Sequence, residues 1–319
     1  MWSVLFGVVM LAALLLFVVA HAIPSVGWGL PHNVSTFGGA IDDLYFGILA
    51  VTGFFFIFTE SLQVYAMWKF RGRTNRRSQY AHGNHRLEVI WTIIPGVILL
   101  VIAIVQVRTW AEVKFAKNMP RPNGETLQME VTAKQWEWQV RYPSPERMNS
   151  WAKDPELAQD FVRAPHSDDL HITNEIHVWK GGAEPTNRQN VLVHLDTQDV
   201  IHSFFLPNLR LKQDALPGKV IKVWFAVTEH NTEPVIDPKT GRKIWVEVGG
   251  LDEKTGKPKD PSKVWELACA EFCGARHSFM RGKLYVHKDK ADFLEWLKAA
   301  EAEQNRYQPL PPSSKVAAR

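Results

Sequence analysis

The sequence predicts an α + β membrane protein in which a transmembrane helical hairpin precedes a mostly β domain that ends in a helix. Two long apolar segments flank a short basic linker, and alternating apolar and polar residues follow from about residue 118. Only two cysteines occur in 319 residues, and 46% of the residues are hydrophobic. These values exclude a disulfide-rich scaffold and a disordered chain.

The first 113 residues contain three apolar segments. Residues 1–22 carry no charged side chain. They predict either a signal peptide, because Ala20-His21-Ala22 resembles a cleavage site, or a third transmembrane helix. Residues 40–113 predict the hairpin. Its second segment, Val89–Val107, has 19 uncharged residues, and a helix of this length spans about 28 Å, which matches a bilayer core.

The linker at residues 69–86 carries six Lys or Arg residues and no acid. By the positive-inside rule it lies in the cytoplasm, so the chain after about residue 113 is outside. We therefore expect a bacterial inner-membrane protein with its large domain in the periplasm. The basic residues cluster in one linker between apolar segments, which excludes a nucleic-acid partner.

Residues 118–300 predict an all-β domain. Apolar residues alternate from Leu127 to Ala133, and the phase then shifts by one residue for the run from Trp136 to Tyr142. Such a shift predicts a β-bulge. Four more short strands are predicted at Val191–Leu195, Val220–Val227, Trp265–Cys269 and Leu284–Val286. Many short strands separated by Pro and Gly favour a small sandwich or barrel.

Polar stretches at residues 143–169 and 229–263 predict surface insertions. An amphipathic helix follows the last strand, and residues 301–319 predict a C-terminal tail. The apolar face of this helix consists of Phe293, Leu294, Leu297 and Ala300.

Four soft or nitrogen ligands lie within twelve residues, at Cys269, Cys273, His277 and Met280. Thiolate and thioether favour Cu(I), and imidazole binds both oxidation states of copper. Two cysteines in one loop allow two bridging sulfurs and hence a binuclear centre, and His202 at a predicted strand end offers a further ligand. A disulfide fits the cysteine spacing alone equally well in an oxidising compartment. A zinc site fits less well, because methionine is a poor zinc ligand.

The segment CAEFCGARHSFM at residues 269–280 resembles the copper-A loop of cytochrome c oxidase subunit II. Residues 199–218 (DVIHSFFLPNLRLKQDALPG) resemble the segment that holds that family's first copper histidine. Residues 134–138 (KQWEW) resemble its aromatic stretch, and residues 87–95 (LEVIWTIIP) resemble the start of its second helix. The resemblance extends in order over about residues 40–300, apart from the two insertions.

This resemblance implies a cupredoxin-like Greek-key domain and a binuclear copper-A centre. The implied copper ligands are His202, Cys269, Cys273, His277, Met280 and the backbone carbonyl of Glu271. The Glu271 carboxylate is implied to reach a magnesium ion shared with subunit I, and Lys212 and Asp214 match positions near that interface. No CxxCH motif occurs, so we expect no haem on this chain.

Two further residues match functional positions of the family. Trp136 resembles the tryptophan through which electrons enter from cytochrome c, the role we expect for it over that of a core or rim aromatic, and for Trp138 we expect a structural role. Glu88 resembles the glutamate at the mouth of a proton pathway. An acid near a helix N-terminus is also stabilised by the helix dipole alone. We expect Glu60 to pack against subunit I.

Some residues depart from the family pattern. Residues 229–263 lengthen the separation of His202 from Cys269 to 66 residues. Lys134 stands in place of a common histidine, and Arg141 stands where some members carry an acid of the docking surface. These departures favour a membrane-anchored or complex-bound cytochrome as the donor.

The sequence thus predicts the copper-A subunit of an oxygen-reducing, proton-pumping cytochrome c oxidase. It would take electrons from a c-type cytochrome and assemble with subunits I and III in the lipid bilayer. The main alternative is a copper-free structural subunit of the quinol-oxidase type with a Cys269–Cys273 disulfide. Nitrous oxide reductase needs a larger chain, and a copper-delivery protein needs exchangeable ligands.

Overall fold

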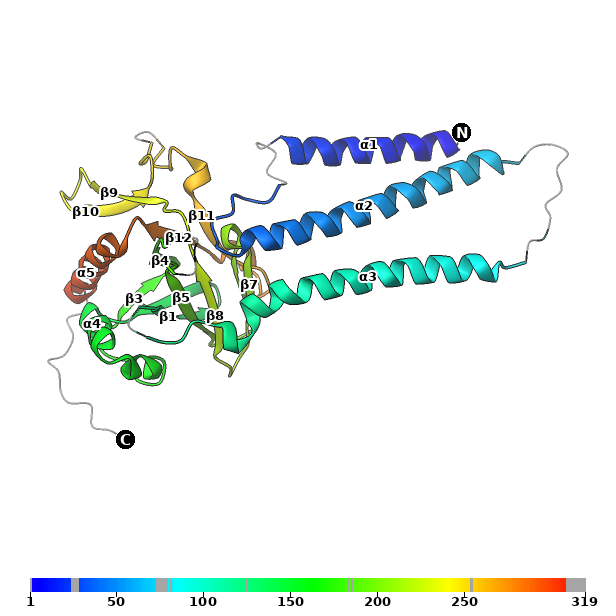
Figure 1. Ribbon diagram of the computed structural model, residues 1–319. Coiled ribbons are helices and arrows are strands. Elements are labelled where there is room, and N and C mark those ends of the chain that lie inside the picture. Colours follow the sequence, from blue (N-terminus) through cyan, green and yellow to red (C-terminus); the bar gives the residue numbers. More distant parts are fainter. Residues whose placement is uncertain are drawn as a thin grey trace. The chain divides into compact units, whose positions relative to one another are not determined.

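The structure is a computed structural model that describes residues 2–23, 29–72, 80, 82–123, 125–182, 184, 186–252 and 255–307. Most of the basic linker and the last twelve residues of the predicted tail lie outside the described residues. The chain divides into two compact units (Figure 1). One unit holds residues 1–31 and 39–112, and the other holds residues 32–38 and 113–319.

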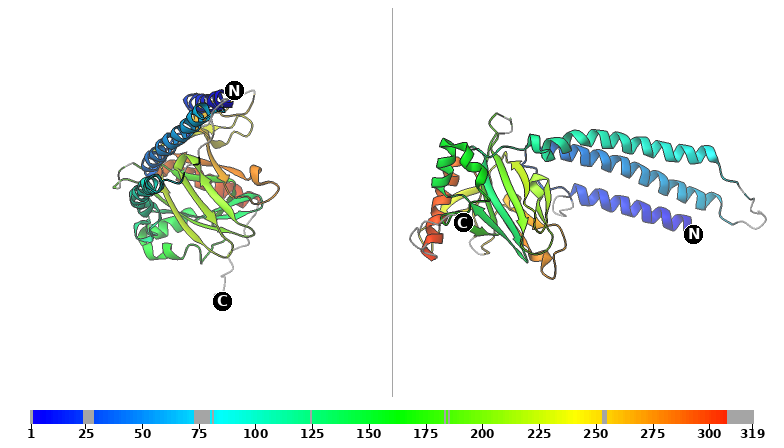
Figure 2. Two further views of the ribbon diagram at one scale, coloured as in Figure 1. Left: turned by 90° about the vertical axis from the view of Figure 1, so that its right-hand side faces the viewer. Right: turned by 90° about the horizontal axis from the view of Figure 1, so that it is seen from below.

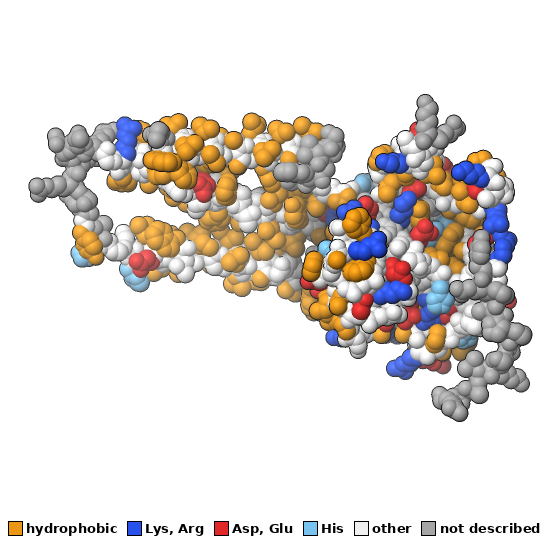
Figure 3. All heavy atoms as spheres, turned by 180° about the vertical axis from the view of Figure 1, so that it is seen from behind, with side chains coloured by type: hydrophobic (Ala, Val, Ile, Leu, Met, Phe, Trp, Pro, Cys, Tyr) orange, Lys and Arg blue, Asp and Glu red, His pale blue; other side chains and the backbone are white. Residues whose placement is uncertain are grey.

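The first unit consists of three helices, α1 (Trp2–Ala22), α2 (Gly38–Lys69) and α3 (His85–Lys114). Helices α2 and α3 are long and apolar enough to cross a membrane. Hydrophobic side chains cover them, whereas charged side chains gather on the other unit (Figure 3). Helix α1 has a shorter apolar run, from Val4 to Ala20. A signal sequence and a retained transmembrane helix would both be helical, so α1 agrees with either prediction.

The second unit is built on two five-stranded sheets (Figure 2). The first has the order β3 (Leu170–Thr173), β2 (Glu137–Tyr142), β1 (Leu127–Lys134), β5 (Asn190–Thr197) and β8 (Ile221–Ala226). The second has the order β4 (Glu175–Trp179), β12 (Arg281–His287), β11 (Trp265–Cys269), β6 (His202–Leu206) and β7 (Leu211–Ala215). Pairs β1–β5 and β4–β12 are parallel, and the others are antiparallel. The predicted α + β architecture is confirmed.

The β-bulge predicted near residue 135 is wrong. Strands β1 and β2 form an antiparallel hairpin in which Lys134 pairs with Glu137, so Gln135 and Trp136 form a two-residue turn. Partners across such a turn have one odd and one even number, as Ala133 and Trp138 do. The apolar face therefore moves from odd to even positions without an inserted residue.

Residues 143–169 are more than a surface insertion. They contain α4 (Pro145–Lys153) and the 3₁₀ helix η3 (Pro155–Asp160), and Trp151, Ala158 and Phe161 form a small buried cluster there. These apolar residues are widely spaced in a mostly polar segment, so the sequence pattern did not predict the cluster.

Residues 229–263 contain a two-stranded sheet of β9 (Thr232–Ile236) and β10 (Lys243–Glu247). Ion pairs join β10 and the residue before it to helix α5 (Lys290–Tyr307): Lys243 to Glu295 at 2.6 Å and Arg242 to Glu303 at 2.7 Å. Phe293 and Leu297 on α5 are fully buried, as predicted. The helix continues to Tyr307, so residues 301–307 are helical and not part of a tail.

Candidate metal centre

The loop between β11 and β12 gathers four of the predicted ligands. Sγ of Cys269, the last residue of β11, lies 3.8 Å from Sγ of Cys273. The Cys273 sulfur lies 3.5 Å from Nδ1 of His277 and 3.8 Å from Sδ of Met280. A hydrogen bond from the Cys269 amide to the Met280 carbonyl, 3.1 Å long, closes the loop. Sequence neighbours thus converge because the strands on both sides of the loop are paired.

His202 comes from a distant part of the sequence. Strand β6 begins with His202 and pairs antiparallel with β11, so that Phe204 faces Cys269. This pairing brings Nδ1 of His202 within 3.8 Å of the Cys269 sulfur. The carbonyl oxygen of Glu271 lies 3.3 Å from the same sulfur. All six predicted ligand groups therefore lie in one cluster.

The donor set of this cluster suits a soft metal ion. Ligand atoms of His202, Cys269 and Cys273 lie within 4.8 Å of one another, so these residues could bind a metal ion. His202 and Met280 are fully buried, and Cys273 is nearly so. Thiolate, thioether and imidazole together favour copper over magnesium or calcium.

Two residues that the sequence analysis did not assign hold the cluster in place. A carboxylate oxygen of Asp199 lies 2.8 Å from Nε2 of His202. The other oxygen accepts a hydrogen bond of 2.7 Å from the amide of Gln135, whose side chain donates to the Cys273 carbonyl at 2.8 Å. Asp199 stands three residues before His202, and this spacing was the one signal in the sequence for such a partner.

Burial changes the acid–base properties of the site. Desolvation, followed by the charge of Cys269, raises the pKa of Cys273 to about 12. The Cys273 thiol therefore keeps its proton until a metal cation displaces it. Desolvation also opposes ionisation of Asp199, but hydrogen bonds from the Gln135 amide and His202 outweigh it and lower the pKa of Asp199.

Trp136 lies beside the loop that joins β11 to β12. Gly274 follows Cys273 and has φ +119°. A Cβ built on it would lie 3.0 Å from the side-chain nitrogen of Gln135 and 3.4 Å from the Trp136 ring. The missing side chain therefore lets the half-buried indole approach the loop. Trp138 is fully buried, and its ring centroid lies 6.2 Å from that of His202, so it supports His202 by packing.

The three residues near the predicted interface with subunit I differ from one another in exposure and contacts. Asp214 accepts a hydrogen bond of 2.7 Å from Ser203, the neighbour of His202, and so braces β6. Lys212 is exposed. The side chain of Glu271 is exposed, although its carbonyl faces Cys269.

The residues expected to act in the membrane belong to the helical unit. Glu88 lies in the first turn of α3, with its carboxylate 3.7 Å from Nδ1 of His85. Glu60 lies on α2 and is half-buried.

Arg141 does not belong to a docking surface. It is 5% exposed and forms ion pairs with Glu130 at 2.6 Å and Asp169 at 2.5 Å. The interpretation of Arg141 as a change in a docking surface is therefore wrong, because strand β2 turns this side chain towards the buried cluster of residues 143–169. Lys134 pairs with Glu137 at the β1–β2 turn, at 2.9 Å.

Two family models match the chain, and together they cover more than half of it. Residues 24–108 match "Cytochrome C oxidase subunit II, transmembrane domain", and residues 127–232 match "Cytochrome C oxidase subunit II, periplasmic domain". The chain belongs to the cytochrome c oxidase subunit II family. It is accordingly a component of an oxidase complex, and a membrane protein with a cupredoxin-like periplasmic domain. Copper A is typical of this family.

Curated relatives extend the subunit II match over most of the chain. Cytochrome c oxidase subunit 2 of Cereibacter sphaeroides is 27% identical over 86% of this chain and 80% of its own length. Alternative cytochrome c oxidase subunit 2 of Bradyrhizobium diazoefficiens is 24% identical over 85% of this chain and 83% of its own length. The crystal structure of the periplasmic domain of subunit II from Bradyrhizobium japonicum is 19% identical, with a TM-score of 0.34, over 58% of this chain and 98% of that chain.

Proposed function

We propose that this subunit accepts electrons from a reduced c-type cytochrome at a binuclear copper-A centre and passes them to a haem of subunit I. The observation that carries the proposal is the pair of thiols 3.8 Å apart, with His202 beside one sulfur and His277 and Met280 beside the other. Each metal of a bridged pair would thus find its own nitrogen ligand. A copper pair bridged by two thiolates spreads one added electron over both ions.

The protein's own contribution is to hold the ligands still. The Ala270 amide donates to the Ser203 carbonyl at 3.0 Å, and the Gln135 side chain donates to the Cys273 carbonyl at 2.8 Å. These bonds tie the ligand loop to β6 and to the β1–β2 turn. Ligands fixed from several sides move little when the charge of the centre changes, which keeps the reorganisation energy of electron transfer small.

Further roles belong to the same proposal. Trp136, next to Gly274, is the point of electron entry. The exposed Glu271 carboxylate binds magnesium together with subunit I, and Glu88 lies at the entrance of a proton pathway. The assembly includes subunits I and III in the bacterial inner membrane, pumps protons and reduces oxygen, and this chain carries no haem.

Copper loading of the full-length chain in detergent micelles tests the centre. We expect about two copper ions per chain and a mixed-valence paramagnetic resonance signal, and Cys273→Ser should abolish both. Met280→Leu should alter the signal, whereas Met129→Leu should not, because Met129 is an equally buried methionine in β1. Fewer than one copper ion per chain would favour the copper-free alternative with a Cys269–Cys273 disulfide.

A further inference from the structure

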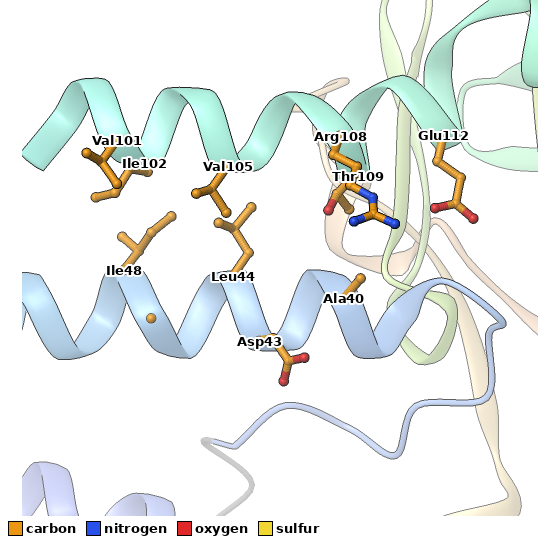
Figure 4. A pocket seen from close by; sticks show the side chains of 11 residues that line it. Ala40, Asp43, Leu44, Ile48, Val101, Ile102, Val105, Arg108, Thr109 and Glu112 are labelled. Carbon is orange, nitrogen blue, oxygen red and sulfur yellow. The ribbon is translucent and has the colours of Figure 1, made fainter.

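A groove runs between the two membrane-spanning helices α2 and α3 (Figure 4). Its volume is about 590 Å³. Aliphatic side chains from both helices line one end, namely Leu44, Ile48, Val101, Ile102 and Val105. Asp43, Arg108 and Glu112 line the other end. The groove is therefore apolar at one end and charged at the other.

The change from apolar to charged lining coincides with the end of the membrane-spanning segments. Asp43 directly precedes the apolar run of α2, and Arg108 directly follows the uncharged run Val89–Val107 of α3. Both boundaries lie at the helix ends opposite the basic linker, which is the periplasmic side. A phospholipid of the outer leaflet has the same order of groups, with acyl chains in the core and a charged head group at the surface.

Small residues on α2 make the groove. Ala40 and Gly47 contribute to its lining, and a Cβ built on Gly47 meets no atom within 4 Å. A larger side chain at this position would enter open space between the helices. The space is thus open to an acyl chain and can be filled by mutation without a clash.

The charged end of the groove carries one cation, Arg108, and two anions, Asp43 and Glu112. Among the described residues, no ion pair or side-chain hydrogen bond involves Asp43, Arg108 or Glu112, although Arg108 and Glu112 share one face of α3. Unpaired charges at the edge of a bilayer core are costly unless a partner neutralises them. One guanidinium and two carboxylates complement a phosphate and an ammonium group, whereas a purely anionic head group would face a net negative wall.

We propose that this groove binds an aminophospholipid of the phosphatidylethanolamine type from the outer leaflet. Arg108 donates hydrogen bonds to the phosphate, and Asp43 and Glu112 accept them from the ammonium group. The aliphatic end packs against an acyl chain. This binding does not depend on copper, so it can fail or succeed independently of the electron-transfer proposal.

Photolabelling of the assembled oxidase complex tests the proposal. The complex is reconstituted in phosphatidylcholine vesicles with a small fraction of phosphatidylethanolamine or phosphatidylglycerol that carries a diazirine on one acyl chain. Labelled peptides are then mapped by mass spectrometry. We expect phosphatidylethanolamine to label the α2 and α3 residues at the aliphatic end more strongly than phosphatidylglycerol does.

Variants distinguish a bound lipid from the general lipid shell. Arg108→Gln should lower groove labelling about fivefold, as expected for loss of one cation near a phosphate, and Gly47→Leu should remove it. Arg86→Gln at the opposite end of α3 and Gly53→Leu elsewhere on α2 are the controls. Equal labelling by both lipids or unchanged labelling in Gly47→Leu would overturn the proposal.

Discussion

The carboxylate of Asp199 lies 2.8 Å from Nε2 of His202, while Nδ1 of the same ring lies 3.8 Å from the Cys269 sulfur. The carboxylate can only accept a hydrogen bond, because other hydrogen bonds keep it ionised. It therefore fixes the proton of the ring on Nε2. The lone pair of Nδ1 then faces the thiols, in the orientation that a metal ligand needs.

Asp199→Asn should weaken copper binding by about 10- to 100-fold, since that is the usual effect of losing a carboxylate behind a ligand histidine. The amide can donate to Nε2 and so favour the wrong tautomer. Competition with a chromophoric Cu(I) chelator measures the change. Asp237→Asn, in the exposed turn between β9 and β10, is the control, and equal affinities of both variants would contradict the assigned role.

Gly274→Ala should slow electron entry from a reduced cytochrome. The new Cβ would lie 3.0 Å from the Gln135 side chain and 3.4 Å from the Trp136 ring, at a φ of +119°, so the ring or the loop must move. Stopped-flow oxidation of the donor by the assembled complex gives the rate. Gly218→Ala is matched in its positive φ of +75° but meets no atom within 4 Å, and it should leave the rate unchanged. If both variants behave alike, Trp136 is not the entry point.

The sequence predicted the helices, the architecture and the clustering of the Cys269–Met280 side chains because each has a local pattern. Uncharged runs mark α2 and α3, and four ligands lie within twelve residues at Cys269–Met280. The β1–β2 turn was mistaken for a bulge because Gln135 and Trp136 lack the Gly or Asn that usually marks a two-residue turn.

Gln135 and Asp199 were not assigned because their roles depend on three loops that meet only in the folded domain. One loop follows β1, one follows β5, and one joins β11 to β12. The short spacing of Asp199 and His202 hints at their contact, but no spacing in the sequence indicates that Gln135 meets either loop. The buried position of Arg141 was missed for the same reason, since its partner Asp169 lies 28 residues away.

Asp169→Asn should destabilise the periplasmic domain by about 3–5 kcal/mol, the usual cost of breaking a buried ion pair. Asp169 is fully buried and pairs with Arg141 at 2.5 Å and Arg147 at 3.0 Å. The amide would remove the ion-pair partner of the buried Arg147 and leave Arg141 with Glu130 alone. Chemical denaturation followed by tryptophan fluorescence gives the free energy of unfolding.

The control for Asp169 is Glu266→Gln, which removes an exposed pair with Arg281 at 3.4 Å. Exposed pairs contribute about 0–1 kcal/mol, so this variant should unfold near the wild-type midpoint. A similar loss of unfolding free energy in both variants would show that the buried ion pairs of Asp169 stabilise the domain no more than an exposed pair does.

His194 should make the periplasmic domain lose stability as the pH falls. Burial, followed by the charges of Lys222 and Arg141, lowers the pKa of His194 to about 4. The Gln128 amide donates to the Ala158 carbonyl, so its oxygen accepts from Nε2 of His194, at 2.9 Å. The neutral ring is therefore the form that the folded domain holds.

The unfolded chain takes up a proton on this histidine below about pH 6.5, whereas the folded domain takes it up only near pH 4. Between these values the free energy of unfolding should fall by about 1.4 kcal/mol per pH unit for this group. His194→Gln keeps a donor for Gln128 but does not titrate. The free energy of unfolding of this variant should therefore fall less steeply with falling pH across this window, by about 1.4 kcal/mol per pH unit. A slope identical to that of the wild type would rule out His194 as the source.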